Sequence, residues 1–257
     1  MITTSERNGW AERFGVAPGQ VERDHLISCV LHAISRRADA GFRFFGGTAL
    51  CRTYLDGSRL SEDIDLLHPD PSQGLAALTE VLPRELNRDY PSLAFAEGQT
   101  DGNGRSAMIE ADDVGQPVKL YVGRFGSDTS AYTFTETPVS LRYSDLPTTV
   151  PIPCPTLPSF VAMKTAAWCD RHVPRDLFDL SGLARIGGFD RDAEQTLRAA
   201  VGYGFVPTEL LRLPRATRTA WDAELAGQLG SLPTADACLA DIERALERLR
   251  DDAKREG

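Results

Sequence analysis

Two short groups of residues in this chain could together bind and transfer a phosphate-containing group. Gly46, Gly47 and Thr48 form a glycine pair followed by a hydroxyl, and Asp63 and Asp65 stand two positions apart further along. Paired glycines allow the backbone to approach a phosphate closely. Residues i and i+2 of a strand point to the same face, so both carboxylates are predicted to project together. Their mutual repulsion favours a bound cation, and oxygen ligands suit Mg²⁺ or Mn²⁺.

Each group alone has a simpler interpretation. A glycine pair is usually a turn, and an Asp-x-Asp segment is usually a solvated strand end. Their order, together with apolar residues on both sides, favours one functional site; the flanking residues are Phe42, Phe44, Phe45, Ile64, Leu66 and Leu67. Paired metal ions can hold the attacking and leaving oxygens of a phosphoryl transfer. The pattern therefore predicts nucleotidyl transfer.

The composition is that of an ordinary globular protein. The 257 residues are 42% hydrophobic and 25% charged, which fits one or two domains with a full core. No apolar run approaches the length of about 20 residues that a membrane span needs, and the N-terminus lacks the apolar region of a signal peptide. We therefore expect a cytoplasmic protein with no membrane partner. The five scattered cysteines predict neither a zinc site nor disulfides.

The net charge of −9 limits the partners that this chain can bind. Proteins that hold long nucleic acid without sequence preference are usually basic. A small substrate or a short footprint on one RNA end remains compatible with the charge. A candidate for such a footprint is the group of arginines spaced by three at Arg212, Arg215 and Arg218.

Hydrophobic periodicity and proline positions predict two domains. Before the proline-rich segment 147–158 we expect helices and strands in alternation: helix 18–40, strand 42–46, helix 48–55, strand 60–67, helix 72–87, and strands 106–111, 117–125 and 138–143. After it we expect only helices: 157–172, 175–186, 190–203, 207–229 and 234–254. The predicted boundary separates domain 1–150, with the glycine pair and the aspartates, from the helical domain 151–257.

A second group of charged residues lies in the helical part. Lys164 stands among apolar residues of one helix, and Arg175, Asp176 and Asp179 begin the next helix at spacings that place them on one side. The simplest interpretation has the lysine reaching to solvent, with the other three forming a structural ion-pair cluster near a helix start.

Taken together, these motifs resemble a known family. The segment GGTALCRTYLDGSRLSEDIDL and the later RDLFDL are similar to motifs of the AbiEii/AbiGii (MenT-type) toxins, which are polymerase-β-like nucleotidyltransferases. The resemblance spans about residues 42–185. It implies an α/β (α+β) fold, with a small mixed sheet in the nucleotidyltransferase core and a C-terminal helical bundle, and a nucleotide in the cleft between them.

The resemblance also implies roles for individual residues. Metal would bind to Asp63 and Asp65. These two would act in catalysis with Lys164 and Asp179. Nucleotide-binding residues would be Gly46, Gly47, Thr48, Arg59, Ser61 and Lys164. A residue beside the metal pair is also a plausible target for inactivation, so Ser61 is a candidate for regulatory phosphorylation.

The expected activity is that of a toxin in a toxin–antitoxin pair. The enzyme would transfer a nucleoside monophosphate, CMP first, from a nucleoside triphosphate to an RNA acceptor and release pyrophosphate. In MenT-type members the acceptor is the 3′ end of tRNA, and its modification blocks aminoacylation and translation. The expected partners are therefore the nucleoside triphosphate, tRNA or another RNA end, and a cognate antitoxin.

The sequence departs from the wider superfamily at one position. Tyr121 stands where many polymerase-β-like enzymes carry a third carboxylate, and Glu110 on a neighbouring predicted strand could substitute for it. Two other functions remain open: transfer of a nucleotide to a small molecule, as in antibiotic-modifying enzymes, and nucleotide binding without catalysis. The negative net charge favours the first of these, whereas the Lys164 block argues against it.

Overall fold

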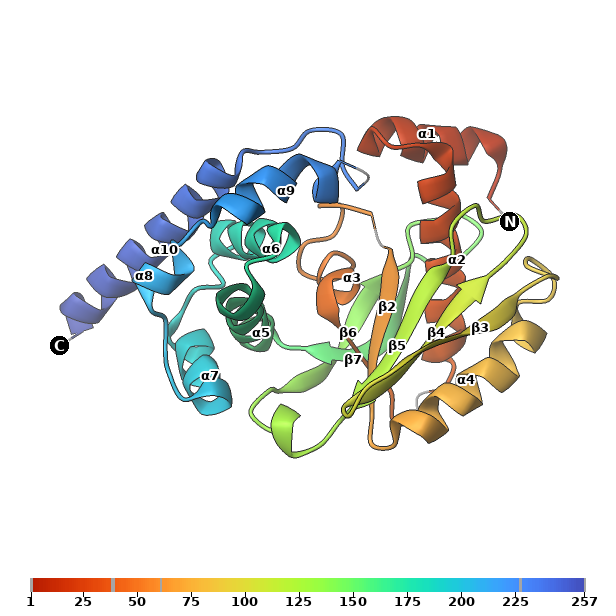
Figure 1. Cartoon of the computed structure of the whole chain (residues 1–257), viewed down its shortest axis with the longest axis horizontal. Helices are drawn as coiled ribbons and strands as arrows, with labels where there is room; N and C mark the ends of the chain where they lie inside the picture. Colours follow the sequence, from red (N-terminus) through yellow and green to blue (C-terminus); the bar gives the residue numbers. More distant parts are fainter. Residues whose placement is uncertain (1, 38–39, 61, 227, 257) are drawn as a thin grey trace. The chain divides into compact units, whose positions relative to one another are not determined.

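The computed structural model consists of two compact units, each described by itself. The first comprises Met1–Ser127, Thr135–Cys154 and Gln228–Gly230, and the second comprises Asp128–Phe134, Pro155–Gly227 and Ser231–Gly257. The structure describes residues 2–37, 40–60, 62–226 and 228–256 (Figure 1). The mixed α/β architecture predicted from the sequence is confirmed.

A five-stranded mixed sheet organises the first unit. Its strand order is β1-β2-β5-β4-β3, in which β2 and β5 are parallel and the other pairs antiparallel (Figure 1). The elements of the sheet and its helices are α1 (Thr4–Phe14), α2 (Pro18–Ser35), β1 (Arg43–Phe45), α3 (Gly46–Leu50), β2 (Asp63–His68), α4 (Pro71–Glu85), β3 (Ala94–Thr100), β4 (Gly104–Glu110) and β5 (Val118–Arg124). The predicted strand 106–111 is β4, and 117–125 is β5.

One face of the sheet is apolar and the other carries the aspartates. Ile64 and Leu66 of β2 are fully buried, while Asp63 and Asp65, which alternate with them, are only partly buried. The helix α4 packs against β2, β4 and β5, and α2 packs against α1 and α4. The alternation along β2 therefore directs the carboxylates away from the apolar core.

Sequence analysis does not predict α1. This helix buries only Ala11 and Phe14, so it shows little hydrophobic periodicity. Its ends are nevertheless well defined. The Thr3 hydroxyl accepts a hydrogen bond from the Glu6 amide at 3.2 Å, and Gly15 ends the helix in the left-handed conformation. The sequence feature that indicates this helix is therefore the pair of capping residues, and not an apolar stripe.

The proline-rich segment contains a strand that the sequence pattern does not predict. β6 (Phe134–Ser140) and β7 (Thr149–Pro155) form a separate two-stranded sheet. Pro151, Pro153 and Pro155 alternate along β7. Residues i and i+2 direct their backbone nitrogens to the same edge of a strand, so alternating prolines leave the other edge able to pair.

The second unit is formed mostly of helices. They are α5 (Leu157–Arg171), α6 (Pro174–Arg185), α7 (Arg191–Val201), α8 (Pro207–Leu210), α9 (Arg215–Leu225) and α10 (Ala235–Glu256), with a short 3₁₀ helix at Ser127–Thr129 that spans both units. α6 packs against α5, α9 and α10, and α5 packs against α7. The predicted helix 207–229 was wrong as a single element, because Pro214 precedes α9 as its N-cap and separates it from α8.

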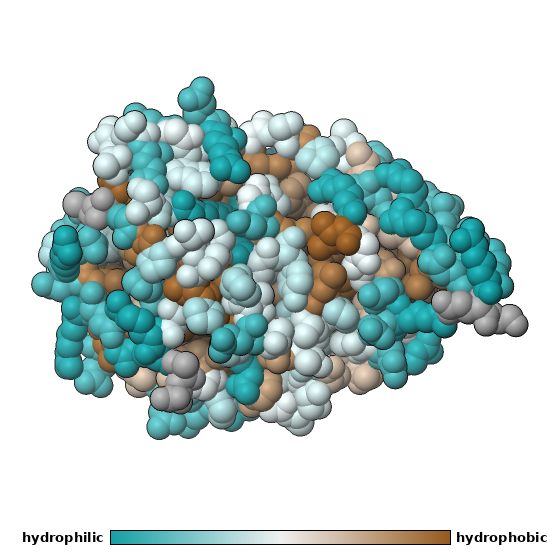
Figure 2. All heavy atoms as spheres, turned by 180° about the vertical axis from the view of Figure 1, so that it is seen from behind, coloured by the Kyte–Doolittle hydropathy of each residue, from teal (hydrophilic) through white to brown (hydrophobic). Residues whose placement is uncertain are grey.

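Apolar side chains are mostly inside both units. Among the described residues, the exposed large hydrophobic side chains are Ile186, Val201 and Tyr203. Figure 2 shows the face opposite to that of Figure 1, where apolar residues reach the surface in separate areas between hydrophilic side chains. In the described part of the chain, no helix has the length and apolar character needed to cross a membrane.

A buried carboxylate links distant parts of the first unit. Asp24 on α2 is fully buried and pairs with two guanidinium groups, at 3.0 Å from Arg52 Nη2 and 3.2 Å from Arg142 Nη1. The Tyr143 hydroxyl donates a third bond to Asp24, at 2.9 Å. Burial by itself would lower the pKa of Arg142, but the surrounding groups, Asp24 first among them, together outweigh desolvation and raise this pKa above its ordinary value.

We expect Asp24→Ala to lower the free energy of unfolding by about 3–5 kcal/mol, because it leaves two buried guanidiniums without their shared anion. Glu80→Ala is the matched control, since it also removes one carboxylate from an ion pair. Its partner Arg84 and Glu80 itself are both exposed, so the change should stay within about 0.5 kcal/mol. Urea denaturation of the wild type and the two variants measures both changes in the free energy of unfolding. Equal losses in the two variants would contradict the proposed contribution of the Asp24 network to stability.

Candidate active site

The structure brings the glycine pair against the aspartates within the first unit. β1 leads directly into α3, where Gly46 adopts a positive φ of 80°. A Cβ atom on Gly46 would lie 2.3 Å from Asp65 Oδ2. Both the backbone conformation and this close approach exclude any larger residue. The carboxylate of Asp65 therefore lies directly on the glycine turn.

Thr48 fixes the other aspartate. Its side chain is fully buried, and its hydroxyl donates a hydrogen bond of 2.7 Å to the backbone oxygen of Asp63. The same hydroxyl lies 3.3 Å from Asp63 Oδ1. Thr48 thus joins α3 to the first residue of β2. Its predicted contact with a nucleotide, and those of Gly46 and Gly47, stay predictions.

The register of the sheet defines the neighbours of the two carboxylates. Asp63 pairs with Lys119 of β5, and Asp65 pairs with Tyr121. Within the described parts of the chain, no set of three histidine, cysteine or acidic side chains could enclose a metal ion. Mg²⁺ commonly binds one or two protein carboxylates together with substrate phosphates. The pair Asp63 and Asp65 beside a glycine turn fits that mode of binding.

Tyr121 occupies the position next to Asp65 where a third carboxylate was considered. A Cβ atom on Gly104 would lie 2.5 Å from the Tyr121 hydroxyl oxygen, and one on Gly123 would lie 2.9 Å from Tyr121 Cε1. The ring therefore lies across two facing glycines of β4 and β5. Burial, and then the charges of Asp101 and Asp65, raise the pKa of Tyr121.

Glu110 is the alternative source of a third carboxylate. It is exposed at the end of β4. β4 is two strands away from β2, which corresponds to about 10 Å across the sheet. Glu110 is therefore not an immediate neighbour of Asp63 or Asp65.

Two predicted nucleotide-binding residues lie in the segment that leads to β2. Arg59 is buried, and its Nη1 donates a hydrogen bond of 2.9 Å to Oε1 of Gln228. This contact gives Arg59 a structural role in the first unit, and its contact with a nucleotide stays a prediction. Ser61, the candidate for nucleotide binding and phosphorylation, lies outside the described residues.

The second unit holds the other predicted site residues in one ion-pair cluster. Lys164 Nζ on α5 lies 3.0 Å from Asp176 Oδ1 and 2.7 Å from Asp179 Oδ2, both on α6. Arg171 Nε is 2.7 Å from Asp176 Oδ2. The Lys164 side chain is only 10% exposed, so the simpler interpretation in which it reaches to solvent does not hold, and its predicted contact with a nucleotide stays a prediction. Two buried carboxylates hold its ammonium group inside.

The same cluster lowers the pKa of Asp176. Burial opposes ionisation of Asp176, but Lys164 and then Arg171 outweigh it and hold its pKa below the ordinary value. Asp179 is fully buried. The structure thus brings Lys164 and Asp179 into direct contact. Arg175 of the same motif is only partly buried. Both interpretations of Lys164 and Asp179, structural and catalytic, are compatible with this geometry.

The three candidate RNA-binding arginines are all exposed, and they differ in their partners. Arg218 Nη2 donates to Asp236 Oδ1 at 2.8 Å, and its Nη1 contacts the other oxygen. Arg212 Nη1 lies 4.0 Å from Glu209 Oε2. Arg215 is the first residue of α9. The carboxylate of Asp236 neutralises part of the charge that Arg218 could offer to a phosphate.

Solved structures with the same fold come from two bacteria. MenT4, a nucleotidyltransferase toxin from Mycobacterium tuberculosis H37Rv, superimposes with a TM-score of 0.64 and 18% identity over 93% of this chain and 87% of that one. The protein JHP933 from Helicobacter pylori gives a TM-score of 0.60 and 15% identity over 94% and 96% of the two chains. At these identities the likeness establishes the fold. No protein with curated annotation matches the chain.

The family assignment comes from the sequence itself. The model of a family described as nucleotidyl transferase AbiEii toxin, type IV toxin–antitoxin system, matches residues 31–250. That range includes the glycine turn, the two aspartates of β2 and the Lys164 cluster. This chain therefore belongs to the AbiEii family of nucleotidyltransferase toxins.

Proposed function

We propose that this nucleotidyltransferase transfers a nucleoside monophosphate, CMP first among the four, from its triphosphate to the hydroxyl at an RNA end, with the 3′ end of tRNA as the first acceptor to test. The observation that carries the proposal is the contact between the glycine turn and Asp65, with Asp63 beside it. Family membership implies an antitoxin and a nucleotide substrate. The choice of CMP and tRNA rests on the resemblance of the motifs, and both substrates would be met in the cytoplasm.

The residues of the first unit suit the donor triphosphate. Asp63 and Asp65 would hold Mg²⁺ together with phosphate oxygens, and the metal would supply charge neutralisation at the reacting phosphate. Without side chains, Gly46 and Gly47 would let a phosphate approach the backbone of the turn closely. In the reaction, the acceptor hydroxyl oxygen bonds to the α-phosphorus while the bond to pyrophosphate breaks. Lys164 would offset the negative charge of the departing pyrophosphate.

A small-molecule acceptor is the second candidate, because the net charge of −9 suits cationic compounds better than RNA. The two candidates are separated by incubating the protein with Mg²⁺, total tRNA and each α-labelled nucleoside triphosphate in turn, with and without an aminoglycoside. Label on RNA supports the proposal. Label on the aminoglycoside alone would contradict it, and so would the absence of any transfer to tRNA from all four donors.

Removing either carboxylate of β2 should stop the reaction without unfolding the protein. We expect Asp63→Asn and Asp65→Asn each to lower the transfer rate by about a hundredfold or more, roughly 2.7 kcal/mol. The free energy of unfolding should stay equal or rise, because two like charges no longer repel each other in the metal-free protein.

Asp113→Asn is the matched control, since Asp113 is an exposed aspartate of the same unit. It should leave both the rate and the stability near wild type. Titration of Mn²⁺ into each variant gives a readout that does not depend on activity, and Asp63→Asn or Asp65→Asn with wild-type Mn²⁺ affinity would contradict the metal assignment.

Substitution of Lys164 can separate its two possible roles. Lys164→Arg keeps a cation between Asp176 and Asp179, so a purely structural lysine should tolerate it. If Lys164 contacts the triphosphate, the bulkier and differently shaped guanidinium should lower the transfer rate at least about tenfold while the melting temperature changes little. Full activity in a folded Lys164→Arg protein would leave Lys164 with the structural role alone.

The exposed arginines should contribute unequally to RNA binding. We expect Arg215→Ala and Arg212→Ala to raise the acceptor KM more than Arg218→Ala does, because Asp236 already pairs with Arg218. Each lost phosphate contact should reduce the slope of log affinity against log salt by about 0.7. Arg250→Ala, on the exposed side of α10, is the control. Equal effects of all four changes on tRNA binding would contradict this assignment, and a loss of donor affinity would place the arginines at the donor instead.

A further inference from the structure

One guanidinium group holds both ends of the segment that joins the glycine turn to the aspartates. α3 ends at Leu50 and β2 begins at Asp63, and residues 51–59 form most of the connection between them. Arg142 Nη2 donates a hydrogen bond of 2.6 Å to the backbone oxygen of Cys51 and one of 3.2 Å to that of Arg59. The two ends of this segment are therefore tied to a single point in the first unit.

Arg142 is itself fixed from the opposite side. Its Nη1 pairs with the buried carboxylate of Asp24 at 3.2 Å, and its side chain is only 2% exposed. Asp24 also pairs with Arg52, the residue that follows Cys51. Arg52 in turn donates to the backbone oxygen of Ser140 at 2.9 Å. The helix α2 thus anchors the segment through two guanidiniums that share one carboxylate.

The backbone of Arg142 is held in an unfavourable conformation. Its φ is +70°, in the left-handed region that non-glycine residues rarely adopt. Such strain persists only where the surrounding contacts determine the conformation, and it is frequent near functional sites. The contacts that determine it here are the bonds of the side chain to Asp24, Cys51 and Arg59.

We propose that Arg142 is a positioning residue for nucleotidyl transfer: it fixes the segment 51–59 and so sets the glycine turn against Asp63 and Asp65. The glycine turn and Asp65 can shift little relative to each other, because Asp65 lies on Gly46 with no space for a Cβ atom. A displacement of about 1 Å at a reacting centre can lower a rate a hundredfold. The inference rests on the nucleotidyltransferase activity but not on the identity of the acceptor.

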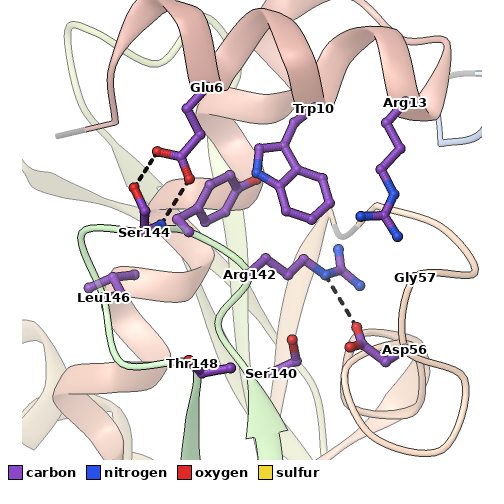
Figure 3. A pocket seen from close by; sticks show the side chains of 11 residues that line it. Glu6, Trp10, Arg13, Asp56, Gly57, Ser140, Arg142, Ser144, Leu146 and Thr148 are labelled. Carbon is purple, nitrogen blue, oxygen red and sulfur yellow. Dashed lines mark hydrogen bonds and ion pairs between the residues drawn. The ribbon is translucent and has the colours of Figure 1, made fainter.

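A cavity beside Arg142 makes the proposal testable by chemical rescue. The cavity has a volume of about 410 Å³ and is lined by α1, by the segment 51–59 and by Arg142. Figure 3 shows Arg13 and Asp56 at the guanidinium end of Arg142, with Trp10 above it. Asp56 Oδ1 is 3.7 Å from Arg142 Nε, and this nitrogen has no hydrogen-bond partner among the described residues. Arg142→Ala would join the vacated space to this cavity, so a small guanidinium compound could enter.

The first measurement needs no activity. Amide hydrogen exchange is compared for peptides covering 51–60 in the wild type, Arg142→Lys and Tyr143→Phe. Lysine keeps the charge near Asp24 but cannot reproduce the fork that reaches two carbonyls. Tyr143→Phe is the matched control, because it removes one hydrogen bond to Asp24 and leaves Arg142 in place. We expect faster exchange in Arg142→Lys, by about tenfold in these peptides, and near wild-type exchange in Tyr143→Phe.

The second measurement compares rate and donor binding. We expect Arg142→Ala and Arg142→Lys to lower kcat at least about tenfold, while the affinity for the Mg²⁺–nucleotide complex changes less than about threefold. Methylguanidinium at millimolar concentration should restore part of the kcat of Arg142→Ala, and methylammonium at equal ionic strength should not. If Arg142→Ala does not fold, Arg142→Lys carries the test.

The outcomes are distinguishable from a failure of the proposed acceptor. Wild-type protein that does not label tRNA would refute the acceptor, and the exchange rates and donor affinities would still decide the role of Arg142. Wild-type exchange over 51–60 in Arg142→Lys, or equal kcat in the wild type and the folded Arg142 variants, would overturn the positioning role. A loss of kcat in Tyr143→Phe as large as in Arg142→Lys would also overturn it, because general weakening of the core would then explain both.

Discussion

The first unit depends on one buried carboxylate that faces two guanidiniums. Burying three charges is costly, and the arrangement is stable only where further hydrogen bonds satisfy the remaining donors. Here backbone oxygens accept from most of these donors: Arg142 donates to Cys51 and Arg59, and Arg52 donates to Asp24 and Ser140. The network therefore connects α2, the end of α3 and the strand β6. Because each connection involves a backbone oxygen, the charges determine where the chain runs as well as which side chains meet.

The central geometry of the site could be predicted from local sequence because it follows from local rules. A period of two places Asp63 and Asp65 on one face, and two glycines at the end of an apolar strand predict a turn that a larger residue could not form. The network behind that turn gave no such signal. Asp24 and Arg142 lie far apart in the sequence, and a charged residue in an amphipathic helix is normally exposed. Only the tertiary structure reveals which of the many acidic and basic residues are buried as partners.

The errors along the chain have a similar origin. Prolines normally exclude a central strand, but the alternating prolines of β7 leave one edge for pairing, so the pattern and not the number of prolines matters. In the helical unit, apolar periodicity continued through residues 207–229, although Pro214 cannot extend the preceding helix. For Lys164, the apolar neighbours in the sequence left a solvent-facing side chain open as the simpler interpretation. It turns inward because Asp176 and Asp179, on the next helix, offer it two carboxylates.

The sheet is shaped to hold Tyr121 at the position where a third carboxylate was considered. If a carboxylate had simply been lost from this position, its neighbours would not need to accommodate an aromatic ring. Gly104 and Gly123 face each other across β4 and β5, and a Cβ atom on either would collide with the ring. Glycine at both positions therefore leaves the space that the tyrosine ring occupies. This fit favours a site whose structure includes the tyrosine over a site that has simply lost a catalytic carboxylate. Tyr121 therefore places a phenol beside Asp65, and burial, followed by the charges of Asp101 and Asp65, raises its pKa.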